Sequence, residues 1–153
     1  MIYGSMIPKE LVPKRQIRLA NVRHESMRFF NIYIGMNKSA EELGIKDYAI
    51  FVSDTMDSVK DAESLKFMEG NNYNVFVCYN TVNPDFSPEG TCAITLLAMF
   101  RSDIWADVPV QDYFKKKEEY ARQIIEAFER QTGIRLMDNI EEIEIATPWT
   151  FAR

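Results

Sequence analysis

The sequence predicts an α+β fold, with a mixed, largely antiparallel sheet of about five strands and helices packed on one face. Several segments are rich in branched and aromatic residues and alternate with the two-residue period of a strand. Other segments have helical spacing and end at a glycine. The helices are too few and too unevenly placed for the regular strand–helix alternation of a parallel sheet.

The first half of the chain is expected to contain three helices and two strands. In order, these are a helix from Pro13, a strand at 27–36, a short helix at 38–44, a strand at 48–53 and a helix at 57–70. Ser58 is expected to cap the last helix, with Asp61 as its capping-box partner. Gly44 and Gly70 are expected to end the two short helices.

The second half is expected to contain three strands and one long helix. The strands are placed at 73–80, 91–100 and 140–148, and the helix at 110–132, ended by Gly133. The expected buried stripe of this helix is Phe114, Ala121, Ile125 and Phe128. In the last strand, Ile143 and Ile145 should point inward, and Glu142 and Glu144 outward.

The central sheet should be apolar on both faces. In 73–79, Val75 and Val77 alternate with Phe76 and Cys78, and the segment 92–100 is apolar at almost every position. The long helix can cover one face, and little in the sequence is available to cover the second. An uncovered apolar face of this size indicates an interface or a ligand surface. Between these strands, Pro84, Pro88 and Gly90 predict a stiff loop.

Composition limits the class of protein. The chain has 153 residues and a net charge of −5, which fits one domain spanning 1–153 and argues against a general nucleic-acid binder. The run Lys115–Lys117 is followed by acids and is expected to be a solvated helix face. Two cysteines, no apparent leader and no long apolar run predict a cytoplasmic protein. Cys78 and Cys92 are expected to be buried, and a hairpin would bring them face to face.

Catalytic patterns are absent from the sequence. The six glycines never have the spacing of a nucleotide-binding motif. A single histidine, His24, is expected at the surface near a helix end, and one histidine cannot build a histidine-rich metal site. Asp54, Asp57 and Asp61 are interpreted as helix caps and first-turn acids rather than cation ligands. No catalytic, metal-binding or cofactor-binding residue is therefore predicted.

Four segments, in this order, resemble one enzyme family. They are "MRFFNIYIGMN", "VFVCYNTVNPDFSPEGTCAITLLAMF", "YFKKKEEYARQIIEAFERQTGI" and "IEEIEIATPWTFAR". Together they resemble the phytoene desaturase and carotenoid isomerase-like branch of the FAD-dependent amine-oxidase superfamily. The resemblance covers nearly the whole chain. The sequence differs from the family pattern in two places. It has no glycine-rich FAD motif before these segments and no flavin-contacting segment after them.

The resemblance implies the substrate-binding domain excised from a larger NAD(P)/FAD-dependent oxidoreductase. The implied partners are the FAD-binding domain of the same protein and a hydrophobic small-molecule substrate. FAD is expected in the full-length protein and is not expected to bind this fragment, which would be inactive alone. The residues expected to face the substrate are Phe29, Tyr33, Phe76, Thr147 and Pro148.

Two other hypotheses follow from the residues. The chain could be a free-standing module that binds an apolar ligand or dimerises through its exposed apolar sheet face. Alternatively, it could be an independent enzyme that uses carboxylates such as Asp54 and Asp57. The binding-module hypothesis and the hypothesis of a substrate-binding domain assign function to the same apolar face. Apolar side chains left uncovered in a monomer mark a contact site.

Overall fold

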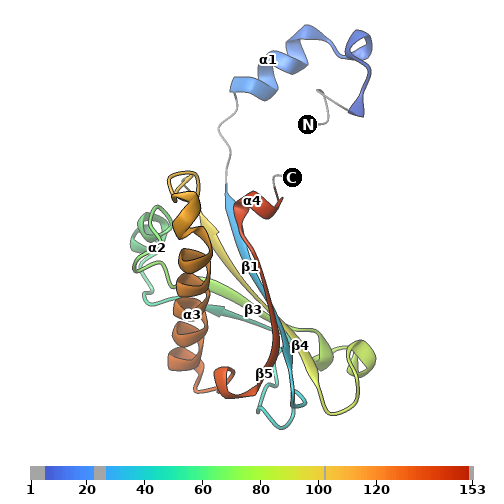
Figure 1. Ribbon diagram of the computed structural model, residues 1–153, viewed down its shortest axis with the longest axis vertical. Coiled ribbons are helices and arrows are strands. Elements are labelled where there is room, and N and C mark those ends of the chain that lie inside the picture. Colours follow the sequence, from blue (N-terminus) through green and yellow to red (C-terminus); the bar gives the residue numbers. More distant parts are fainter. Residues whose placement is uncertain (1–5, 23–26, 102, 152–153) are drawn as a thin grey trace.

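The centre of the fold is a five-stranded sheet with the strand order β2-β3-β4-β1-β5 (Figure 1). The structure is a computed structural model, and it describes residues 6–22, 27–101 and 103–151. The strands are β1 (Arg28–Met36), β2 (Ala49–Val52), β3 (Asn74–Cys78), β4 (Cys92–Phe100) and β5 (Ile140–Ala146). Every neighbouring pair is antiparallel. The predicted α+β fold is confirmed, and the sheet is antiparallel throughout its described strands.

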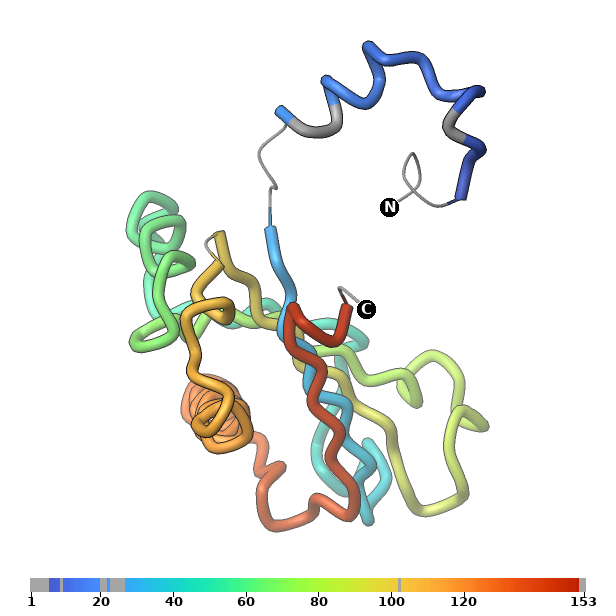
Figure 2. Tube along the Cα trace, turned by 45° about the horizontal axis from the view of Figure 1, so that its top comes forward, coloured from blue at the N-terminus to red at the C-terminus, as the bar shows by residue number. Residues whose placement is uncertain are grey.

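One long helix covers one face of this sheet. The helices are α1 (Lys14–Val22), α2 (Ser58–Ser64), α3 (Tyr113–Thr132) and α4 (Pro148–Phe151), and 3-10 turns lie at Lys9–Leu11, Tyr79–Thr81, Pro84–Phe86, Val110–Asp112 and Met137–Asn139. Figure 2 shows α3 on one side of the sheet and the loop between β3 and β4 on the other. In the view of Figure 1, α1 stands away from the sheet. The predicted end of α3 at Gly133 is confirmed, since Gly133 has a left-handed φ of 76°.

The two longest strands, β1 and β4, form the middle of the sheet. Their register pairs Phe30 with Ala98, Ile32 with Leu96, and Ile34 with Ile94. All six side chains are buried, and by strand alternation they face α3. The segment 27–36, which the sequence predicts as a strand, therefore has Phe30, Ile32 and Ile34 on one face.

Stacked aromatic rings join α3 to the sheet. The rings of Phe76 on β3 and Phe128 on α3 are stacked, with centroids 4.5 Å apart. Trp105, in the segment before α3, is almost fully buried and stacks on Phe30 at 5.2 Å. Tyr120 of α3 meets Phe30 edge to face at 4.9 Å. Large buried rings of this kind contribute about 1.5–3 kcal/mol each, so this layer is a main source of stability.

The segment 38–44 forms a turn rather than the predicted helix. The N–H of Leu43 donates to the carbonyl of Ser39 at 3.2 Å, and the N–H of Ile45 donates to that of Ala40 at 2.8 Å. Gly44 then reverses the chain with a φ of 73°. One turn of this length fixes several residues for few hydrogen bonds, so it does not extend into a helix.

The cap of α2 is also corrected by the structure. Asp57, not Ser58, is the N-cap, and its carboxylate accepts hydrogen bonds from the N–H groups of Val59 and Lys60. The carboxylate of Asp61 accepts from the hydroxyl of Ser53 at 2.7 Å instead of completing a capping box. The helix ends at Ser64, well before the predicted Gly70.

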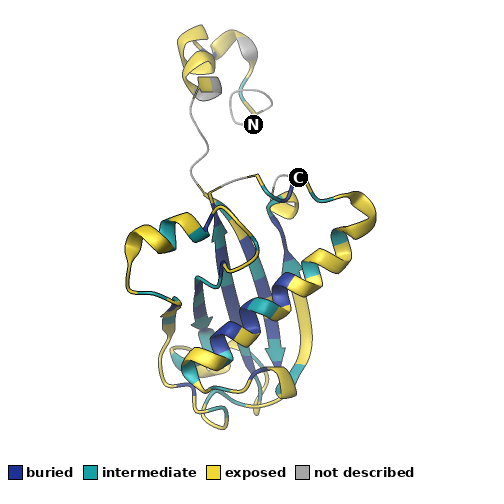
Figure 3. Cartoon of the chain, turned by 90° about the vertical axis from the view of Figure 1, so that its left-hand side faces the viewer, coloured by how far each residue is buried: buried dark blue, intermediate teal, exposed yellow. Residues whose placement is uncertain are grey.

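Two residues predicted to be buried are exposed. Ala121, Ile125 and Phe128 of the α3 stripe are buried as predicted, but the side chain of Phe114 is 70% exposed because the first turn of α3 extends past the core. Ile143 lies opposite Ile34, on the side that faces α3, yet it is 42% exposed. In Figure 3, α3 crosses the sheet diagonally and leaves an exposed strand at the margin. The helix therefore does not reach β5 over its whole length.

Candidate functional site

The side of the sheet away from α3 is the candidate functional site, and we call it the open face. It is formed by Phe29, Asn31, Tyr33, Phe51, Val75, Val77, Thr95, Leu97 and Met99. Phe29 and Tyr33 are each 42% exposed, and Phe51 is 70% exposed. Burial of such side chains is favourable by about 25 cal/mol per Å² of apolar surface, so this face favours contact with another apolar surface.

Strand register brings the open-face residues together in rows. One row runs from Phe51 through Val75 and Leu97 to Asn31. These residues come from β2, β3, β4 and β1, which are far apart in the sequence. Register keeps residues of one parity on one side of the sheet, so these side chains form a continuous row that is apolar except at Asn31.

A short polar strip crosses this apolar surface. The amide of Asn31 donates a hydrogen bond to the hydroxyl of Tyr33 at 2.8 Å. The hydroxyl of Thr95 donates to that of Tyr79 at 3.5 Å. Thr95 and Tyr33 are backbone partners across β1 and β4, so the two hydrogen bonds lie on adjacent strands, and Thr95 itself is buried. The strip supplies hydrogen-bonding groups within a surface that is otherwise apolar.

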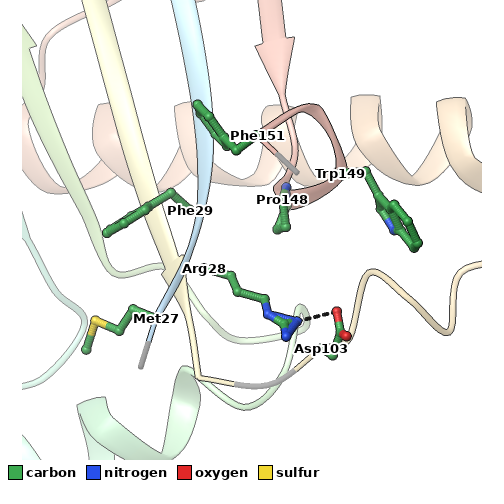
Figure 4. A pocket seen from close by; sticks show the side chains of 7 residues that line it. All are labelled: Met27, Arg28, Phe29, Asp103, Pro148, Trp149 and Phe151. Carbon is green, nitrogen blue, oxygen red and sulfur yellow. Dashed lines mark ion pairs between the residues drawn. The ribbon is translucent and has the colours of Figure 1, made fainter. Parts of the chain in front are cut away.

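One end of the open face opens into a hollow of about 370 Å³ (Figure 4). It is lined by Met27, Arg28, Phe29, Asp103, Pro148, Trp149 and Phe151. Arg28 points toward Asp103 and forms an ion pair with it (Figure 4). The indole N–H of Trp149 donates to the carbonyl of Trp105 at 3.0 Å, which ties α4 to the segment before α3. The hollow thus combines aromatic walls with the Arg28–Asp103 ion pair.

The other end of the open face is bounded by the loop between β3 and β4. The rings of Tyr79 and Phe86 are stacked at 4.6 Å and line a second hollow of about 390 Å³ beside Tyr33. Asn80 holds this loop together. Its amide N–H₂ donates to the hydroxyl of Ser87 at 2.9 Å, and its carbonyl oxygen accepts from the N–H of Ala93 at 2.9 Å.

Three of the five residues expected to face the substrate lie along the open face. Phe29 and Tyr33 are on β1, and Pro148 lines the hollow at its end. Phe76 is on the opposite side of the sheet, fully buried against α3. Thr147 is fully buried as well, and its hydroxyl shares a 2.5 Å hydrogen bond with that of Tyr113. Phe76 and Thr147 are therefore in the packed interior and do not join the other three.

Several residues of the open face and of its two ends are not singled out from the sequence as facing a substrate. Phe51 and Leu97 belong to strands that are apolar on both sides, so periodicity does not show which side is uncovered. Trp149 and Phe151 follow the last strand, where the family-like segment "TPWT" was the only available signal. Asn80 lies in the 3-10 turn that follows β3, whereas the sequence places it at the end of the strand 73–80. Asparagine is common in turns, where its side chain bonds nearby backbone groups.

The predicted burial of both cysteines is confirmed. Cys78 and Cys92 are free thiols on neighbouring strands. A hydrogen bond from the Cys92 thiol lowers the pKa of Cys78 to about 7 despite burial, and the backbone N–H groups of Asn80 and Thr81 add to this effect. The same thiol contact and burial raise the pKa of Cys92.

The aspartates at 54, 57 and 61 have structural partners. Asp57 caps α2, and Asp54 accepts hydrogen bonds from the side chains of Asn72 and Gln131. The bond from Asn72 is the main cause that lowers the pKa of Asp54. Within the described residues, no three His, Cys, Asp or Glu side chains are grouped so that they could hold a metal ion. The predicted position of His24 lies outside the described residues.

No protein-family model matches this chain, and no curated protein matches it. Among the described helices, none is long and apolar enough to cross a membrane.

Proposed function

We propose that the chain is the substrate-binding domain of an FAD-dependent oxidoreductase that acts on a hydrophobic substrate. The observation that carries this proposal is the open face, whose aromatic and aliphatic side chains come from four adjacent strands. In the intact enzyme this face would cover the substrate and exclude water from it. The resemblance of the four ordered sequence segments to the phytoene desaturase-like family supports the same assignment.

The described residues do not fit the phosphate groups of FAD. A dinucleotide pyrophosphate usually sits at a helix N-terminus that follows a strand through a glycine-rich turn. Here the N-caps of α2 and α3 are Asp57 and Asp112, whose carboxylates would repel a phosphate. We infer that a separate FAD-binding domain of the same protein holds the cofactor. Bound there, the flavin would supply the redox chemistry of a desaturation, oxidation or isomerisation.

The role left to this chain is to bind and orient the substrate. The apolar rows of the open face would hold a hydrocarbon skeleton, since they provide contact area without charge. The hydroxyl of Tyr33, whose side chain is 42% exposed, would interact with any oxygen that the substrate carries, whereas Thr95 is buried beneath this surface. We place the protein in the cytoplasm, and its two free, buried thiols fit a reducing compartment.

The second candidate is a free-standing module that binds an apolar ligand or dimerises through the open face. Phe51 favours it, because this exposed ring lies on the outer strand β2, where a second copy could reach it. Light scattering of the purified chain separates this candidate from the first. A stable dimer whose formation is lost in Phe51→Ser would favour self-association, and a monomer would favour the substrate-binding domain.

The direct test of the proposed function is the longer reading frame around this coding segment. We expect it, or a partner chain, to contain a glycine-rich FAD motif, and its purified product to show a flavin absorbance spectrum. In that product, Phe29→Asp should abolish turnover of the apolar substrate and leave the flavin spectrum intact. Val59→Asp on α2 is the matched control, since Val59 is 69% exposed away from the open face. Absence of any flavin motif would overturn the proposal.

A further inference from the structure

The outer strand β5 has an unpaired edge. It is hydrogen-bonded to β1 on one side and, among the described strands, has no neighbour on the other. The strand order places β5 at the margin of the sheet. Alternate residues of such a strand direct their N–H and C=O groups outward, where another extended chain can pair with them.

A groove lies beside this edge on the side that faces α3. It has a volume of about 420 Å³ and is lined by Phe114, Lys117, Glu118, Ala121, Arg122, Ile125, Met137, Ile140, Ile143, Glu144 and Ile145. Its apolar side chains are incompletely covered: Phe114 is 70% exposed, Ile143 is 42% exposed and Met137 is 38% exposed. The groove is therefore an apolar trough that runs between α3 and β5.

The other side of the same strand is acidic. Glu142 and Glu144 alternate with Ile143 and lie opposite Gly35 and Tyr33 of β1, on the side of the open face. Both glutamates are exposed. The two sides of the β5 edge thus differ in chemistry. Ile143 faces the groove, whereas Glu142 and Glu144 follow the opposite parity, although Glu144 also lines the margin of the groove.

This charge pattern argues against a second copy of β5 as the occupant. Antiparallel self-pairing centred on Ile143 would place Glu142 of one copy opposite Glu144 of the other. Like charges directly opposite each other destabilise a strand pair. A strand with basic side chains on that side would instead form cross-strand pairs with opposite charges.

We propose that the β5 edge binds an extended polypeptide segment in which apolar and basic side chains alternate. Its backbone would pair with β5 as a sixth strand. Its apolar side chains would enter the groove against Phe114 and Ile143, and its lysines or arginines would lie beside Glu142 and Glu144. Glu142 and Glu144 also line the second hollow of the open face, so the two sites meet there. The backbone edge of β5 and the groove beside α3 lie outside the substrate contact, and their use goes beyond the proposed function.

The first experiment uses a synthetic peptide of seven residues, as long as β5, in which lysine alternates with isoleucine or valine. The control peptide has the same composition with its lysines grouped at one end. Binding is followed by NMR of the isotope-labelled chain. We expect the alternating peptide to shift the amide signals of β5 and to bind at least about five-fold more tightly than the control. Equal binding of the two peptides would overturn the proposal.

The second experiment tests backbone pairing. In an extended strand, all lysines of the alternating peptide direct their N–H groups to one side, and all apolar residues direct theirs to the other. Two further peptides carry N-methyl groups on either the lysines or the apolar residues. Binding should be lost only by the peptide whose N-methyl groups replace the N–H groups that face β5. Equal retention or equal loss in both peptides would contradict strand addition.

The third experiment tests the charges and the groove. Glu144→Lys should weaken binding of the alternating peptide about five-fold or more, while Glu126→Lys on α3 makes the same charge change at an exposed position away from β5. Ile143→Asn should also weaken binding, with the circular dichroism spectrum of the chain unchanged. If Glu126→Lys weakens binding as much as Glu144→Lys, the attraction is non-specific and the proposal fails.

Discussion

Phe29 and Phe30 are neighbours on β1 and lie on opposite sides of the sheet. Phe30 is fully buried and stacks on Trp105 at 5.2 Å, whereas Phe29 is 42% exposed on the open face. The two rings have the same chemistry, and strand alternation alone gives them different environments. One ring contributes to the packed core, and the other is available to a second surface.

The first prediction separates these two roles. Phe30→Ala should lower the free energy of unfolding by about 3–5 kcal/mol, because it leaves a cavity beneath α3. Phe29→Ala should lower it by less than about 1 kcal/mol, since its ring is already partly in water. Urea denaturation followed by circular dichroism measures both changes. Equal losses would show that the open face is packed in the chain itself.

The second prediction concerns an apolar fluorescent dye as a probe of the open face. A double variant, Phe29→Ser with Leu97→Ser, should reduce dye fluorescence several-fold, because both residues belong to the uncovered apolar rows. Val59→Ser removes an exposed apolar side chain from α2 and is the matched control. If the control reduces fluorescence equally, the dye is not reporting on the open face.

The third prediction concerns the end of α3. Gly133 has a φ of 76°, and a Cβ there would meet no atom within 4 Å, so any cost of Gly133→Ala is backbone strain. We expect a loss of about 1 kcal/mol in the free energy of unfolding. Gly133→Asn should cost less, because asparagine tolerates the left-handed region. Thermal unfolding of the two variants compares them, and an order of stability opposite to this one would be inconsistent with a left-handed cap.

The fourth prediction identifies the cap of α2. Asp57→Ala should cost about 1 kcal/mol, since its carboxylate accepts hydrogen bonds from two backbone N–H groups. Ser58→Ala should cost clearly less, because Ser58 is the first residue of the helix rather than its cap. Chemical denaturation of both variants gives the comparison. A larger loss of unfolding free energy for Ser58→Ala would instead support Ser58 as the cap, as the sequence predicts.

The fifth prediction follows from the lowered pKa of Asp54. Hydrogen bonds, first from Asn72 and then from Gln131, favour the charged carboxylate in the folded chain. A pKa that is lower in the folded state contributes stability above the unfolded pKa, and this stability is lost as the pH falls through the folded pKa. Asp54→Asn should therefore lose less stability than the wild type between about pH 5 and about pH 2. Identical pH profiles would show that the Asp54 contacts contribute nothing measurable.

Strand periodicity predicted the sheet well. The alternation in 27–36 places Phe30, Ile32 and Ile34 in the core, and the two-sided apolar pattern of 92–100 predicts a central strand. Glycine also predicts the end of a helix correctly where the backbone is left-handed, as at Gly133 after α3. These features are local, so a short window of sequence contains the information.

The errors came from long-range packing. Phe76 was expected to face a substrate, but the side of β3 that meets α3 is set by tertiary contact with Phe128. Phe114 continues the apolar stripe of α3 beyond the point where the sheet lies beneath it. Thr147 has a buried hydroxyl because Tyr113, distant in the chain, lies beside it. Periodicity gives the faces of an element and does not say which neighbour each face meets.

The most direct test of the central claim is hydroxyl-radical footprinting of Phe29 and Tyr33 in the longer protein and in the isolated chain. The substrate-binding role requires the open face to be covered by the flavin domain and the bound substrate. We expect both residues to be modified several-fold more slowly in the longer protein, while the exposed ring of Phe114, on the opposite side of the sheet, keeps its rate. Equal modification of Phe29 and Tyr33 in the two proteins would contradict the claim.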